Sequence, residues 1–111
     1  MPGRSDVLRG TLDLMILQTL ELSPMHGYGI SRRLEQLTQG EVGVSPGSLF
    51  PALYRLEHHG WVRGKWGASD NGRRARYYAL TAAGRRALSS EQTSWERLSQ
   101  AVNLIMRMTP G

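Results

Sequence analysis

The sequence of 111 residues contains no cysteine and few aromatic residues. The absence of cysteine excludes disulfides, zinc sites built on thiolates and cysteine-based redox sensing. No apolar run reaches the roughly 20 residues that a membrane-spanning helix needs, and residues 1–10 lack the apolar core of a secretory signal. We therefore expect a cytoplasmic protein that has no disulfides and does not insert into a membrane.

Groupings of residues that support catalysis are also missing. Ser48 has no evident base in the sequence, the acidic residues are scattered, and the glycine-rich pattern of a phosphate-binding loop does not occur. His58 and His59 are adjacent, so on a helix their rings diverge and do not share a metal ion with good geometry. The sequence predicts no enzymatic activity, no cofactor and no metal site.

Acidic residues are outnumbered by basic ones. There are 14 lysines and arginines against 9 aspartates and glutamates, which gives a formal net charge of +5. This balance suits a polyanionic partner such as nucleic acid. A chain of this length forms one small domain with a modest core, and a dimer interface would add buried surface to it.

Residues 45–60 have the pattern of a helix with defined ends. Ser45 stands before Pro46, and its side-chain oxygen is expected to accept a backbone N–H, while proline at the first helical position loses no hydrogen bond. Gly60 is a typical stop. Leucines at helical spacing form one apolar stripe for the core, namely Leu49, Leu53 and Leu56.

The opposite face of this helix is unusual for one that merely faces solvent. It carries small or compact residues, among which we count Ala52, so the backbone can approach another surface closely, together with hydrogen-bonding and charged groups. Such a helix fits a DNA major groove, which is about 12 Å wide. Pro51 removes an internal hydrogen bond and is expected to bend or loosen the first turn. The face consists of Gly47, Ser48, Pro51, Tyr54, Arg55 and His58.

A basic hairpin is predicted directly after this helix. Strands over residues 61–66 and 75–80 flank the turn sequence GASDNG at residues 67–72, which favours a tight turn with positive φ. By itself a charge run of this kind is most simply a solvated hairpin. Beside the preceding helix, it is typical of a wing, residues 65–76, that contacts phosphates. Its cations are Lys65, Arg73, Arg74 and Arg76.

Two helices are expected before this pair. Residues 11–22 are apolar nearly all round, so we expect this helix to be shared between the core and a dimer partner. The periodicity of residues 27–38 predicts a second helix that points Ile30, Leu34 and Leu37 inward. Residues 39–44 can hold at most the short first strand of a winged helix.

A long last helix is predicted from a cap at Thr81 to about Met108. Apolar residues recur along it at heptad-like spacing, which indicates a seam for another helix. The chain therefore divides into residues 1–80, which form the DNA-binding domain, and residues 81–111, which form the dimerisation helix. The predicted dimer interface consists of Leu12, Met15, Leu88, Trp95, Leu98, Val102 and Ile105.

Two aromatic side chains allow more than one interpretation. His26 precedes a predicted helix, where a local hydrogen bond is a simpler role than a pH switch. Trp95 lies on the predicted seam, where an indole either fills the interface or lines a flat pocket for a small aromatic effector. We favour packing for Trp95.

Five segments of the sequence together resemble the PadR family of bacterial transcriptional regulators, and within it a short group described from acidobacteria. They read LRGTLDLMILQTL, HGYGISRRLE, VSPGSLFPALYRLEHHGWV, GRRARYYALTAAGRRAL and WERLSQAVNLIMRM, and they cover nearly the whole chain. The resemblance implies a homodimeric, repressor-type winged helix-turn-helix protein, mainly α with a small β-hairpin (α+β), whose long C-terminal helix serves dimerisation. The family usually has tyrosine where this chain has Phe50, so any hydrogen bond from that phenol is absent.

The function predicted from these features is sequence-specific regulation of transcription. A homodimer would place two helices 45–60 in successive major grooves of double-stranded DNA, about 34 Å apart, on an inverted repeat. A winged-helix adaptor that contacts protein or RNA without operator specificity is the alternative. The residues expected to contact DNA are Ser45, Gly47, Ser48, Pro51, Tyr54, Arg55, Lys65, Arg73, Arg74 and Arg76.

Overall fold

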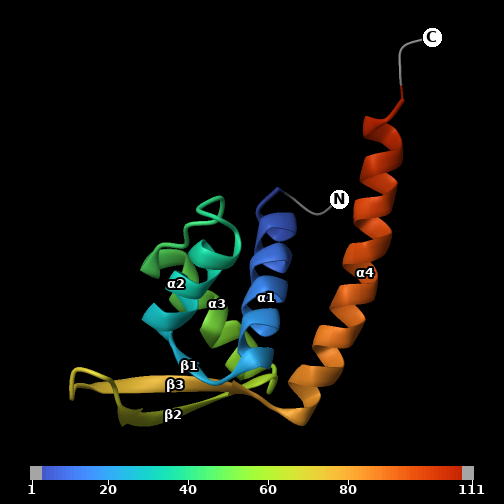
Figure 1. The fold of residues 1–111 in the computed structure, drawn as a ribbon. Coiled ribbons are helices and arrows are strands. Elements are labelled where there is room, and N and C mark those ends of the chain that lie inside the picture. The colour runs from blue at the N-terminus through green and yellow to red at the C-terminus, as the bar shows by residue number, and fades with distance from the viewer. Residues whose placement is uncertain (1–3, 109–111) are drawn as a thin grey trace.

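The computed structural model describes residues 4–108, with side chains from residue 10 onward (Figure 1). The ends of both predicted domains, residues 1–3 and 109–111, lie outside this range. The described part is mainly helical with a small antiparallel sheet, so the predicted fold class is confirmed. The elements are α1 (Arg4–Leu22), β1 (Met25–His26), α2 (Gly27–Leu37), α3 (Pro46–His58), β2 (Val62–Ala68), β3 (Arg74–Leu80) and α4 (Ala82–Met106).

The sheet has the strand order β1-β3-β2, and both pairings are antiparallel. β2 and β3 form the predicted hairpin, and Gly72 in its turn has a φ of +79°. The prediction of a short strand in residues 39–44 is wrong, because the short strand is β1, which pairs Met25 with Tyr78. Gln39 and Gly40 instead adopt positive φ and end the turn after α2.

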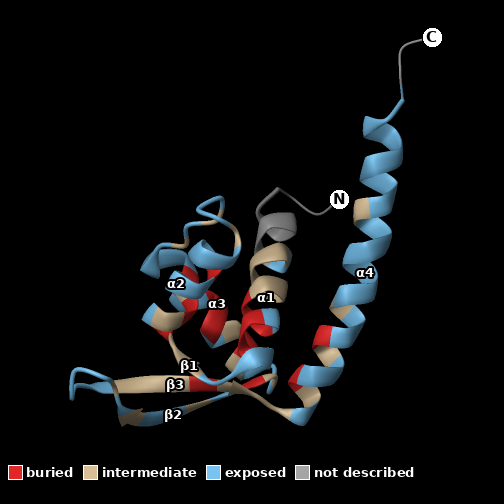
Figure 2. Cartoon of the chain, viewed as in Figure 1, coloured by how far each residue is buried: buried red, intermediate tan, exposed pale blue. Residues whose placement is uncertain are grey.

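The core lies where α1, α2 and α3 face one another above the sheet (Figure 2). The leucine stripe of α3 is buried there, as predicted. Ala52 is also fully buried and is not part of the outer face, because it lies beside this stripe on the helical wheel. Leu37 was predicted to point inward but is 55% exposed, since it occupies the last turn of α2 at the edge of the body.

The start of α4 is anchored to the end of α3. The Thr81 side chain caps α4 as predicted, accepting a hydrogen bond from the Gly84 N–H at 3.0 Å. The same hydroxyl donates to the Gly60 carbonyl at 2.6 Å, and the Thr81 N–H donates to the Trp61 carbonyl at 3.1 Å. The first turns of α4 therefore belong to the same packed body as the helix before the hairpin.

The prediction that Leu88 lies in the dimer interface is wrong. Its side chain is only 3% exposed in the single chain and belongs to the core cluster, so it is not available as a dimer contact. The C-terminal part of α4 extends past the rest of the body (Figure 1). Although its outer half exposes many apolar side chains, no helix of the described residues is long and apolar enough to cross a membrane.

Candidate nucleic-acid interface

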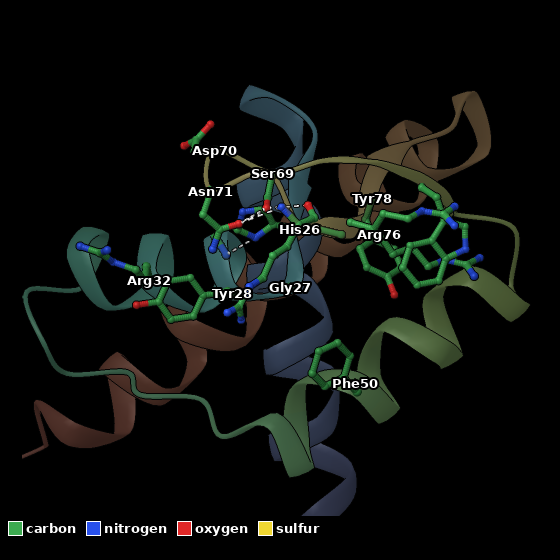
Figure 3. A pocket seen from close by; sticks show the side chains of 15 residues that line it. His26, Gly27, Tyr28, Arg32, Phe50, Ser69, Asp70, Asn71, Arg76 and Tyr78 are labelled. Atoms are coloured by element: carbon green, nitrogen blue, oxygen red, sulfur yellow. Dashed lines mark hydrogen bonds between the residues drawn. The ribbon is translucent and has the colours of Figure 1, made fainter.

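A cleft of about 760 Å³ separates the start of α2 from the hairpin turn, and α3 borders it (Figure 3). Tyr28 and Arg32 line it from α2, Phe50 reaches it from α3, and Trp66 lines it from β2. Arginines of the turn and of β3 complete the wall. Helix α3 and the basic hairpin thus border the same cleft.

The outer face of α3 is open to solvent. Gly47, Ser48, Pro51 and Tyr54 are all exposed, and the Tyr54 side chain is 73% exposed. Ser45 occupies the N-cap position, but its side chain makes no capping hydrogen bond, contrary to the prediction. A partner can therefore approach the first two turns of α3 without displacing other parts of the described chain.

The hairpin turn is held in one shape by its own hydrogen bonds. The Ser69 N–H donates to the Arg73 carbonyl at 2.8 Å, and the Arg73 N–H donates to the Asn71 side-chain oxygen at 3.2 Å. The guanidinium of Arg74 lies 5.2 Å from the centre of the Trp66 ring, a distance typical of a cation–π contact. The turn therefore presents its arginines from a defined backbone.

The wing cations do not all point the same way. Side chains alternate between the two faces of a strand, so Arg74 and Arg76 share the cleft face with Trp66. Lys65 lies opposite Tyr77 and belongs to the other face. Among the side chains that the structure describes, neither Arg73 nor Arg74 forms an ion pair with an acid.

Two of the predicted DNA contacts are occupied by ion pairs within the chain. The Nη2 atom of Arg55 lies 2.8 Å from an oxygen of Asp13 on α1, and both side chains are mostly buried. Arg76 pairs with Glu57 of α3. Neither guanidinium is therefore free in the way that the sequence predicted.

Arg55 also has a buried Nε without a hydrogen-bond partner in the described part of the chain, where Asp13 is the acid that pairs with its guanidinium. We expect Asp13→Asn to lower the free energy of unfolding by about 2 kcal/mol, since it leaves a largely buried cation unpaired. Urea denaturation measures this change. Glu41→Gln, at an exposed loop position, is the control and is expected to change the free energy little. Equal stability of the two variants would contradict a stabilising pair.

The comparison with known proteins agrees with this architecture. Residues 16–90 match the transcriptional regulator PadR-like family. The chain belongs to this family. A transcriptional regulator of Mycobacterium tuberculosis is 34% identical over 94 residues, which cover 85% of this chain and 84% of that protein. Its membership of the short acidobacterial-type group stays a prediction.

Solved structures of transcriptional regulators share the fold of this chain. A PadR-like transcriptional regulator from Bacillus cereus has a TM-score of 0.79 at 29% identity, covering 94% of this chain and 99% of that one. A transcriptional regulator from Clostridium thermocellum has a TM-score of 0.80 at 28% identity, covering 88% and 95%. Members of the PadR family regulate transcription by binding DNA, so the winged helix of this chain is a DNA-binding module.

Sequence reasoning missed several residues that line the cleft, among them Tyr28, Arg32 and Trp66. Tyr28 and Arg32 are four residues apart on α2, and the Arg32 guanidinium lies 5.7 Å from the Tyr28 ring centre. That spacing was visible in the sequence as a pair on one helix face. The predicted local role of His26 is confirmed, because its Nδ1 accepts the Gly29 N–H at 2.9 Å and caps α2.

Trp95 lines a second, more apolar hollow of about 320 Å³ between α1, α2 and α4. Leu14, Met15 and Leu34 contribute to its wall. The indole is partly exposed in the single chain, as are Leu98, Val102 and Ile105 further along α4. Met15 and Leu12 of α1 are half-buried against the core, so α1 has less free apolar surface than the sequence predicted.

Proposed function

We propose that this PadR-family protein is a repressor-type regulator that binds an inverted-repeat operator as a homodimer. The outer face of α3 enters the major groove, and the hairpin β2–β3 contacts the flanking backbone. The observation that carries this proposal is that α3, through Phe50, and the unpaired arginines of the turn line the same cleft, while the neighbouring face of α3 is exposed. A duplex whose major groove holds α3 would therefore bring its phosphates close to Arg73 and Arg74.

The roles of the two elements differ chemically. Gly47, Ser48 and Pro51 allow close approach of the backbone, while Tyr54 supplies a phenol that can donate a hydrogen bond to a base edge or a phosphate. The turn arginines are expected to pair mainly with backbone phosphates, so they add affinity and register. Few side chains of α3 read bases directly, and we therefore propose that DNA shape contributes to specificity.

The deciding experiment selects bound fragments from the source genome and measures their affinity against scrambled fragments of equal length at two salt concentrations. An operator-binding protein binds its selected fragment more tightly than the scrambled one at both salt concentrations. A protein or RNA adaptor shows only the electrostatic background, which falls alike for all sequences as salt rises.

The wing assignment makes a quantitative prediction. Arg73→Ala and Arg74→Ala are each expected to weaken binding to all sequences similarly and to reduce the slope of log affinity against log salt by about one unit. Arg107→Ala, near the exposed end of α4, removes the same charge and is expected to leave the slope unchanged. An unchanged slope in both wing variants would remove the turn from the interface.

We also propose that the hollow beside Trp95 is where a small aromatic effector would act. Its wall is mostly apolar and joins α1, α2 and α4, so a bound ring would change how α4 leaves the body. Quenching of Trp95 fluorescence by aromatic compounds, in a chain whose other two tryptophans are phenylalanine, tests this role.

A further inference from the structure

An ion pair joins α3 to the hairpin at the edge of the exposed reading face. The Nη2 atom of Arg76, on β3, contacts the Oε2 atom of Glu57, near the end of α3. Tyr54 and His58 lie beside the pair and line the same small hollow. The contact therefore lies between the helix that enters the groove and the strand that leads from the wing.

The neighbouring strand is shaped to accept the Arg76 side chain. Gly64 and Arg76 lie on one face of the hairpin, since Gly64 pairs with Tyr78 and Trp66 pairs with Arg76. A Cβ atom at Gly64 would stand 2.1 Å from the Arg76 Nε and 2.7 Å from its Nη2. The guanidinium thus packs directly against the backbone of Gly64. The side chain of any larger residue at position 64 would occupy this space.

The arrangement restricts the Arg76 guanidinium on its other sides as well. Its Nε is buried and has no hydrogen-bond partner in the described part of the chain. The guanidinium lies 5.9 Å from the centre of the Tyr78 ring. Burial raises the pKa of the Tyr78 phenol above its ordinary value, although the Arg76 charge lowers it, so the phenol stays neutral beside the cation.

Glu57 and Arg55 stand on opposite edges of the outer face of α3. Two positions along a helix correspond to about 200° around its axis. Arg55 ties one edge to α1, whereas Glu57 ties the other edge to β3. The exposed face that contains Tyr54 is thus held between two ion pairs, and only the second one connects it to the wing.

We propose that Glu57, Arg76 and Gly64 form a brace that fixes the angle between α3 and the wing, and that this angle determines operator specificity. Arg76 is then a positioning residue and does not contact phosphate. This inference rests on the proposed function. A helix in the groove and a wing on the backbone must fit one duplex together, so a wing that is already fixed loses less entropy on binding.

The brace predicts opposite effects on specific and non-specific binding. Glu57→Ala raises the net charge by one, which by electrostatics alone strengthens binding to every sequence. We expect it instead to weaken operator binding about tenfold while binding to scrambled DNA stays equal or rises. Gly64→Ala changes no charge and displaces the Arg76 guanidinium, so it is expected to give the same loss of operator binding.

Glu41→Ala is the matched control, because it removes an acid from an exposed loop and is expected to preserve the ratio of the two affinities. A result in which Glu57→Ala strengthens both classes of DNA equally would overturn the brace. It would mean that Arg76 is released to bind phosphate. Thermal unfolding of each variant confirms that it is folded at the temperature of the binding assay.

A measurement without DNA separates the brace from the proposed function. The chain has no cysteine, so Asp70→Cys at the wing turn and Gln36→Cys on α2 allow two spin labels to be placed specifically. In full-length protein diluted with unlabelled chain, we expect a narrow distance distribution that broadens in both brace variants and not with Glu41→Ala. Unchanged widths in both variants would refute the brace, even if the operator experiment succeeds. Absence of sequence preference in the unmodified chain would instead refute the proposed function, and with it the role of the angle in specificity, while the brace itself would stand.

Discussion

Leu98→Glu combined with Ile105→Glu is expected to dissociate the proposed homodimer and to lower its affinity for the proposed inverted-repeat operator by about a hundredfold or more. Both side chains are exposed in the single chain, at 50% and 68%, and they lie on the same apolar stripe of α4 as Trp95 and Val102. A two-fold interface brings each new carboxylate near its copy, so every substitution introduces its charge twice. A monomer then holds only one half-site and loses the effective concentration that the second would add.

Light scattering during size-exclusion chromatography measures the mass, and fluorescence anisotropy measures operator affinity. Thr93→Glu combined with Gln100→Glu is the matched control. Both residues are exposed on α4 and adopt positions of the heptad away from the stripe, so two charges are added to the helix outside the predicted seam. A dimer that persists in the first variant would show that another surface joins the two copies.

The parts of this fold that the sequence predicts are those fixed by neighbours along the chain. Helix α3 starts at Pro46 after Ser45 and stops before Gly60, whose φ of +77° explains why glycine stands there. Its leucines are buried because their spacing places them on one face. Thr81 caps α4 through a residue three positions away. Such features need no knowledge of the tertiary arrangement.

The misplaced features depend on contacts between distant segments. Arg55 and Asp13 are 42 positions apart, so no local pattern distinguishes a DNA-reading arginine from one paired with α1. β1 contains two residues, too few to show a strand periodicity. It is a strand because Met25 pairs with Tyr78 of β3. Leu88 fits a heptad seam as well as a core position, and only the packing of the first turns of α4 decides between them.

Gly84→Ala is expected to lower the free energy of unfolding by about 3 kcal/mol. A Cβ atom at this position would stand 2.0 Å from the Trp61 carbonyl oxygen and 2.9 Å from its carbon. These are backbone atoms and cannot move aside by changing a rotamer, so α4 must shift away from the end of α3. The shift also opposes the hydrogen bond from the Thr81 hydroxyl to Gly60, which ties the two helices together.

Thermal unfolding tests this prediction, with an expected fall in the midpoint of about 10 °C or more. Gly10→Ala is the control, because Gly10 lies in α1 with nothing within 4 Å of the added atom, and alanine there is expected to be neutral or stabilising. If the Gly84 variant still folds, the displaced α4 changes the spacing of the two reading helices in the proposed dimer. Its operator affinity should then fall even at temperatures below the melting range. An unchanged midpoint would show instead that the junction between α3 and α4 adapts easily and does not set that spacing.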